Sequence, residues 1–131
     1  MHSFTLRVYY EDTDLAGIVY YANYLKFIER ARSEWVRSLG VDQALLREKQ
    51  GVVFAVRRVE ADYLRPALFD DVLTIKTMRA HYSGARLVLD QAVLRRDESL
   101  FTARVTLVCL SAAGAATRFP AAMRAALTEG H

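Results

Sequence analysis

The first third of the chain changes from the period of a strand to the period of a helix. Apolar residues alternate with polar ones from Phe4 to Tyr10, which predicts a strand over residues 3–10. Apolar residues then recur every three or four positions and predict an amphipathic helix over residues 22–39, with the apolar face Tyr24, Phe27, Ile28, Ala31, Trp35 and Leu39. Asn23 is the candidate N-cap of this helix, and Gly40 stands where a glycine commonly ends one.

Alternation with a period of two returns in the rest of the chain. It predicts four more strands, over residues 52–64, 71–82, 86–95 and 100–111. Short helices are predicted over residues 41–49, with Asp42 as the cap, and over residues 121–127, with a loop at residues 112–116. This order predicts an α+β fold in a single domain, residues 1–131, with one long helix on an antiparallel sheet of about five strands. Because one helix covers only part of a sheet, we expect a homo-oligomer, a dimer or a tetramer.

Composition narrows the class of protein. The chain has 131 residues, of which 53% are hydrophobic and 25% charged, so a packed core is expected. Its apolar runs are far shorter than the ~20 residues of a membrane-spanning helix, and no signal peptide is recognisable at Met1. The single cysteine, Cys109, lies in an apolar run and is predicted to be a buried thiol. We therefore expect a cytoplasmic protein.

The segment from Tyr9 to Tyr24 is the candidate site of chemistry. It joins the first strand to the long helix through the acidic turn Glu11-Asp12-Thr13-Asp14. These carboxylates could cap the turn, bind a divalent cation or catalyse a reaction close to the free N–H groups of a helix start. No histidine or second acidic cluster lies nearby to complete a metal site, so we predict neither metal nor cofactor.

The net charge, the absence of three common motifs and the placement of the aromatic residues narrow the possible classes of ligand and reaction. The net charge of +3 favours an anionic ligand such as a phosphorylated cofactor or an acidic carrier protein. Neither a P-loop, nor a dinucleotide-binding glycine pattern, nor a serine-hydrolase elbow occurs in the sequence. The aromatic residues alternate into putative core faces, which disfavours a nucleic-acid-binding surface.

Residues 10–24, followed by Phe27, Glu29, Arg30 and Ala31, resemble the opening motif of the hotdog-fold acyl-CoA thioesterases. Both the 4-hydroxybenzoyl-CoA thioesterase group and the thioesterases associated with the Tol–Pal cluster are similar. Further matches lie at residues 59–66, 70–73 and 83–86. Tyr21 stands where the Tol–Pal-associated members usually carry histidine, which favours the first group and an aryl-CoA substrate.

The resemblance implies a long helix wrapped by a curved antiparallel sheet, and a dimer whose two sheets join, with active sites at the subunit interface. It implies that Asp14 is the catalytic carboxylate, as nucleophile or general base. The backbone N–H of Tyr21 would bind the thioester oxygen, and Gly17 would let the turn approach the substrate. Predicted substrate contacts are Tyr20, Tyr24, Ser83, Gly84 and Arg86, with Arg86 as the phosphate contact.

Three functions follow from these residues. Hydrolysis of an acyl- or aryl-CoA thioester by Asp14 is the leading hypothesis. A non-catalytic module that binds acyl-CoA or acyl carrier protein is the alternative, although a pure binder has no need of the Asp14 carboxylate. A hotdog dehydratase would need an Asp–His pair, and no histidine lies near the turn or the long helix.

Overall fold

The computed structural model describes residues 1–128 and has the predicted α+β architecture. The helices are α1 (Asn23–Ser38), α2 (Gln43–Gln50) and α3 (Ala121–Thr128), with a short 3-10 turn at Tyr10–Asp12. The strands are β1 (His2–Arg7), β2 (Val53–Tyr63), β3 (Val72–Ser83), β4 (Arg86–Arg95), β5 (Glu98–Leu110) and β6 (Ala116–Thr117). Within residues 1–128, no helix combines the length and the apolar composition that a membrane span requires.

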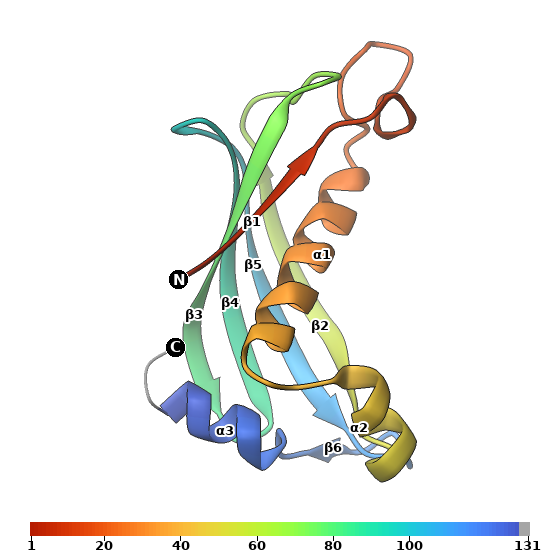
Figure 1. Cartoon of the computed structure of the whole chain (residues 1–131), viewed down its shortest axis with the longest axis vertical. Coiled ribbons are helices and arrows are strands. Elements are labelled where there is room, and N and C mark those ends of the chain that lie inside the picture. The colour runs from red at the N-terminus through yellow and green to blue at the C-terminus, as the bar shows by residue number, and fades with distance from the viewer. Residues whose placement is uncertain (129–131) are drawn as a thin grey trace.

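The strands form one antiparallel sheet in the order β1-β3-β4-β5-β2. β6 pairs with β5 as a sixth, two-residue strand, which takes in only Ala116 of the loop predicted at residues 112–116. Figure 1 shows the sheet curving around α1, as the hotdog resemblance implied. The segment between β1 and α1 lies at one end of the molecule, and α2, α3 and β6 lie at the other. Within residues 1–128, β2 pairs with β5 on one side and with no strand on its other side.

The core lies between α1 and the inner face of the sheet. Phe27, Ile28 and Ala31 of α1 are at most 1% exposed, and Trp35, on the same predicted apolar face, is 4% exposed. The sheet contributes fully buried residues of β3, β4 and β5, among them Leu73, Ile75, Leu87, Leu89, Val105 and Cys109. The prediction of a buried Cys109 thiol is confirmed, and burial raises its pKa.

A buried polar network fixes α1 on the sheet. The Gln91 amide of β4 donates to the Ile28 carbonyl of α1 at 3.0 Å and to the Thr77 hydroxyl of β3 at 2.9 Å. Its oxygen accepts a hydrogen bond from the Arg32 guanidinium at 3.0 Å. Because buried polar groups are costly when unpaired, this network defines one position of α1 along the strands.

Two predicted element ends were wrong. Strand β1 ends at Arg7 rather than at residue 10, because Asp12 Oδ2 accepts the Tyr9 N–H at 2.8 Å and turns the chain. Asn23 is the first residue of α1 and not its N-cap; its side chain donates to the Asp12 carbonyl at 2.9 Å. Gly40 ends α1 as predicted, with a φ of 83°. Asp42 caps α2 as predicted and accepts the Leu45 N–H at 3.0 Å.

Candidate active site

The acidic segment folds into a small hairpin rather than an open loop. The Asp14 N–H donates to the Ile18 carbonyl at 2.9 Å, and the Tyr20 N–H donates to the Asp12 carbonyl at 2.9 Å. The turn closes with the Gly17 N–H on the Asp14 carbonyl at 3.0 Å. Gly17 has a φ of 81°, a conformation that glycine adopts without strain. The hairpin therefore places Asp14 at a defined position before the tip.

The Asp14 carboxylate is held by one oxygen. Its Oδ1 accepts the Ala16 N–H at 2.9 Å, which is an Asx turn. Its Oδ2 accepts no hydrogen bond from any group in residues 1–128, and the side chain is half-buried. The Asx turn orients the group while one oxygen stays available for chemistry.

Asp12 has a structural role, unlike Asp14. Its side chain accepts the Tyr9 N–H, and its carbonyl accepts both the Tyr20 N–H and the Asn23 side chain. The turn-capping interpretation therefore holds for Asp12. No group of three or more His, Cys, Asp or Glu residues within the described chain is arranged to hold a metal ion.

Tyr20 and Tyr21 join the hairpin to α1. Both side chains are exposed, and their ring centroids are 4.9 Å apart. The pKa of Tyr20 is raised, first by the neighbouring Tyr21 phenol and least by the Asp14 carboxylate. Within residues 1–128 the Tyr21 N–H has no acceptor, and this donor lies two residues before α1 begins.

Tyr24 was predicted to contact substrate, but its side chain is packed in the core. It is 3% exposed, and its ring stacks on Phe101 at 5.0 Å. Its hydroxyl accepts the Ala67 N–H at 3.0 Å, and burial raises its pKa. Tyr24 therefore supports the segment that lies beside the hairpin.

The structure does not bring Ser83, Gly84 and Arg86 close to Asp14 within one chain. They form the turn between β3 and β4, and β3 runs 12 residues from Val72, near the hairpin end, to Ser83. At the usual rise per residue, this strand separates the two groups by roughly 35 Å. The predicted site is therefore split between the two ends of the protomer.

Tyr63 is a neighbour of the candidate site that the sequence did not single out as a site residue. Its hydroxyl, at the end of the edge strand β2, donates to the Tyr21 carbonyl at 3.1 Å. Its ring also packs edge-on against Tyr21 at 6.1 Å. In the sequence, Tyr63 stands only as one more aromatic residue of an alternating strand. The contact places the edge of the sheet beside the candidate oxyanion donor.

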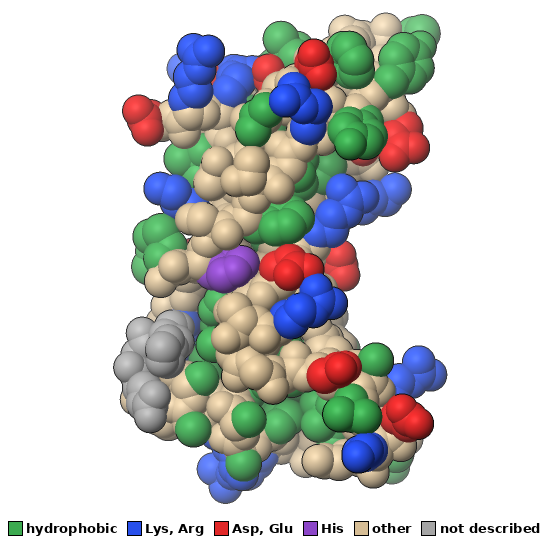
Figure 2. Space-filling model, viewed as in Figure 1, with side chains coloured by type: hydrophobic (Ala, Val, Ile, Leu, Met, Phe, Trp, Pro, Cys, Tyr) green, Lys and Arg blue, Asp and Glu red, His purple; other side chains and the backbone are tan. Residues whose placement is uncertain are grey.

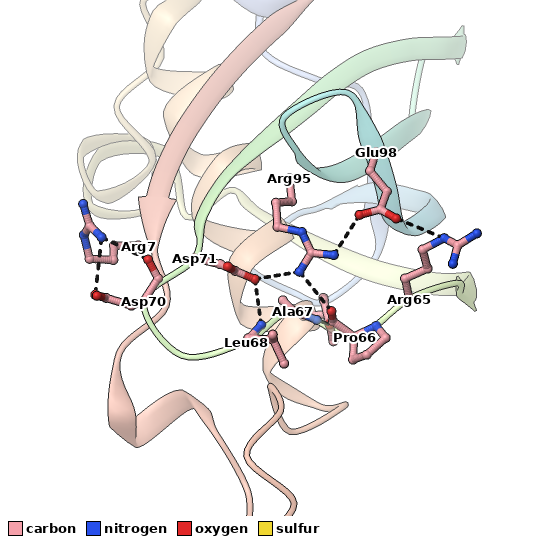
Figure 3. Close-up of polar contacts among 10 residues, drawn as sticks. Arg7, Arg65, Pro66, Ala67, Leu68, Asp70, Asp71, Arg95 and Glu98 are labelled. Carbon is pink, nitrogen blue, oxygen red and sulfur yellow. Dashed lines mark hydrogen bonds and ion pairs between the residues drawn. The ribbon is translucent and has the colours of Figure 1, made fainter.

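Residues 65–71 form the outer support of the hairpin. The Ala67 carbonyl accepts the Val19 N–H at 2.9 Å, and Ile18 forms a bridge with Leu68. Arg95, at the end of β4, binds this segment through Asp71 and the Pro66 carbonyl (Figure 3). Neither Arg95 nor Asp71 was predicted as a site residue.

The surface around the hairpin is rich in exposed apolar side chains. Figure 2 shows hydrophobic side chains gathered at the hairpin end of the molecule. They include Tyr9, Tyr10, Leu15, Leu68 and Phe69, each at least 46% exposed. A groove of about 600 Å³ instead lies on the outer sheet face and is lined by residues such as Lys76, Asp90 and Arg104. In one chain the candidate site is therefore an open apolar surface and not a closed pocket.

The chain is similar in sequence to a family of thioesterases. Residues 8–127 match the family model of the thioesterase-like superfamily. The chain is 42% identical over 108 residues to the acyl-CoA thioesterase YbgC of Haemophilus influenzae, covering 82% of this chain and 79% of that protein. It is 42% identical over 107 residues to the acyl-CoA thioester hydrolase YbgC of Escherichia coli O6:H1, covering 80% and 78%.

A solved structure agrees with these sequence matches. A probable thioesterase from Bartonella henselae superposes with a TM-score of 0.87 at 41% identity, covering 91% of this chain and 98% of that one. The region that matches the family model, residues 8–127, includes the hairpin of Asp14, the start of α1 and every strand of the sheet from β2 onward. The chain belongs to the thioesterase-like superfamily and has its hotdog fold.

Proposed function

We propose that this protein hydrolyses acyl-CoA thioesters, with Asp14 as the catalytic carboxylate. The observation that carries the proposal is the free Oδ2 of Asp14, held by an Asx turn in the hairpin that leads into α1, where the Tyr21 N–H has no acceptor within residues 1–128. A thioester carbonyl placed between them would meet a nucleophile or base on its carbon and a donor on its oxygen. The names of the relatives support the same substrate class.

Two routes fit this arrangement. In one, Asp14 Oδ2 attacks the carbonyl carbon, the C–S bond breaks, CoA leaves as thiolate, and water then cleaves the mixed anhydride to restore the carboxylate. In the other, Asp14 takes a proton from a water molecule whose oxygen attacks the carbonyl, and the proton passes to the leaving sulfur. In both routes the Tyr21 N–H stabilises the tetrahedral oxyanion, a contribution of about 3 kcal/mol for a well-placed donor.

A dimer through β2 would complete the site. Tyr63, at one end of this edge strand, touches Tyr21, so a second chain paired along β2 would lie beside the candidate site. Antiparallel pairing about a two-fold axis would also place the Ser83–Arg86 end of the partner near the Asp14 end of the first chain. Arg86 could then bind the anionic nucleotide of a substrate that reacts at Asp14 of the other protomer.

The test is thiol release from a panel of CoA esters by wild type, Asp14→Asn and Asp97→Asn. The panel contains benzoyl, phenylacetyl, short aliphatic and long aliphatic groups. Asp97 is the control, because it is an exposed carboxylate in another turn. Activity that is lost only in Asp14→Asn supports the proposal, and the preferred ester separates an aryl from an aliphatic substrate. Wild-type turnover in Asp14→Asn refutes the role of Asp14, whereas tight binding without release by wild type favours a binding module.

A further inference from the structure

We propose that Arg95 positions the Asp14 hairpin for catalysis without touching the substrate. The inference rests on the proposed role of Asp14. Arg95 ends β4, on the rigid sheet, whereas the hairpin has no long element of its own. The connection between them is the segment of residues 66–71, which bonds to Arg95 on one side and to the hairpin on the other (Figure 3).

The Arg95 guanidinium binds three acceptors. Nη1 donates to Asp71 Oδ2 at 2.8 Å and to the Pro66 carbonyl at 3.3 Å, and Nη2 donates to Glu98 Oε1 at 2.7 Å. The Arg95 side chain is 28% exposed and that of Asp71 20%, so this is the least exposed ion pair of the described chain. Its planar fork satisfies acceptors in different directions at once, which a lysine ammonium on a flexible stem does not reproduce.

Asp71 passes this support to the hairpin. The same Oδ2 that binds Arg95 accepts the Leu68 N–H at 2.8 Å, and the Asp71 N–H donates to the Leu68 carbonyl at 3.1 Å. Leu68 forms a bridge with Ile18, whose carbonyl accepts the Asp14 N–H at 2.9 Å. A series of hydrogen bonds therefore runs from the guanidinium of Arg95 to the backbone of Asp14, through a β-bridge whose hydrogen bond joins the Val19 N–H to the Ala67 carbonyl.

Loss of Arg95 would leave the Pro66 carbonyl and one oxygen of Asp71 without their cationic donor. The segment would keep its bonds to Tyr24 and, at Asp70 and Asp71, to Val8 and Arg7. Its part next to the hairpin would lose its connection to β4, and the hairpin would relax with it. Because a misplacement of about 1 Å can lower a rate by ~100-fold, kcat should fall by at least about tenfold. The KM should change by less than about threefold, because Arg95 does not contact the substrate.

The experiment compares Arg95→Met and Arg95→Lys with Arg104→Met. Arg104 is a matched control: its guanidinium binds Asp90 at 2.8 and 2.9 Å on the outer face of β5, away from the hairpin. We expect a lower kcat in Arg95→Met, partial recovery in Arg95→Lys, and wild-type kinetics in Arg104→Met. A wild-type kcat in folded Arg95→Met, or a raised KM with an unchanged kcat, would overturn the proposal.

A double-mutant cycle separates positioning from general support of the fold. If Arg95 acts through Asp14, Arg95→Met should not lower the residual activity of Asp14→Asn any further. An equal loss in both backgrounds would overturn the proposal. If Arg95→Met does not fold, Asp71→Asn replaces it in the cycle, because the asparagine keeps an oxygen for the Leu68 N–H. Wild-type activity in Asp14→Asn alone refutes the proposed role of Asp14, so the two failures are distinguishable.

Discussion

The Tyr63 hydroxyl of β2 donates a hydrogen bond to the backbone carbonyl of Tyr21, across 42 positions of sequence. This contact ties the end of the edge strand to the residue whose N–H is the candidate oxyanion donor. The Tyr63 ring also packs against Tyr24 and Phe101, at centroid distances of 5.6 and 5.0 Å. The Tyr21–Ala22 peptide plane is therefore held by the sheet as well as by the start of α1, and it joins the plane that carries the Tyr21 N–H at the Tyr21 Cα.

Tyr63→Phe should lower kcat with little loss of stability. Phenylalanine keeps the ring contacts and removes only the bond to the Tyr21 carbonyl. The Tyr21–Ala22 peptide plane then gains freedom to rotate, and the N–H on the other side of the Tyr21 Cα is held less firmly. We expect a kcat reduced by a few fold and a free energy of unfolding lowered by at most about 1 kcal/mol. Steady-state kinetics and urea denaturation measure the two quantities.

Tyr82→Phe is the matched control for that change. Tyr82 packs on Phe119 at 6.2 Å, at the opposite end of β3, and its hydroxyl bonds to no group in residues 1–128. Its kinetics should equal those of wild type. If Tyr63→Phe also behaves as wild type, the bond to Tyr21 has no part in placing the donor.

Unlike Tyr63→Phe, Tyr24→Phe should mainly reduce the free energy of unfolding rather than kcat. The Tyr24 hydroxyl is the acceptor of the Ala67 N–H, and Ala67 is completely buried. A buried donor without an acceptor costs about 1–3 kcal/mol, so the unfolding midpoint in urea should shift clearly to a lower concentration. An unchanged midpoint would mean that the Ala67 N–H finds another acceptor.

The Asp90–Arg104 pair on the outer sheet face should make a pH-dependent contribution to stability. The hydrogen bond from Arg104 lowers the pKa of Asp90. The contribution is therefore present above the unfolded pKa of about 3.9 and is lost as the pH falls through the lower folded value. Both side chains are about half exposed, which limits the contribution to less than about 1 kcal/mol. The difference in Tm between wild type and Asp90→Asn should be larger at neutral pH than in acid; the reverse order would contradict the assignment.

The sequence predicted those features whose cause is local. The helix α1 follows from the three- and four-residue spacing of apolar side chains such as Phe27 and Trp35, and its end follows from Gly40. The end of β1 was wrong because the alternation continues through Tyr9, whereas the chain turns when Asp12 captures the Tyr9 N–H. A side-chain bond of this kind leaves the hydrophobic pattern unchanged.

Long-range neighbours could not be read from the spacing of residues. The support of Asp14 by Arg95 depends on which strand ends meet, and this is set by the register of β3 with β4 and by the backbone bonds of residues 66–71. For the same reason, Arg86 and Asp14 were predicted in one site although they lie at opposite ends of the folded protomer, because the length of β3 separates them. Tyr24 is buried because it lies on the apolar face of α1. The prediction that Tyr24 contacts substrate did not take this position into account.

Alanine substitutions at Gly17 and Gly114 can distinguish the effect of backbone strain on stability from an effect on catalysis. Gly17 has a φ of 81° and Gly114 a φ of 79°, and a Cβ at either position would meet no atom within 4 Å. Alanine at either site should therefore lower the free energy of unfolding by a similar amount, about 1 kcal/mol, through the left-handed backbone alone. Only Gly17→Ala should also reduce kcat, because the strained residue closes the turn that begins at Asp14. Equal kinetics in the two variants would show that the catalytic geometry tolerates a rearranged hairpin tip, and would leave Gly17 with a purely structural role.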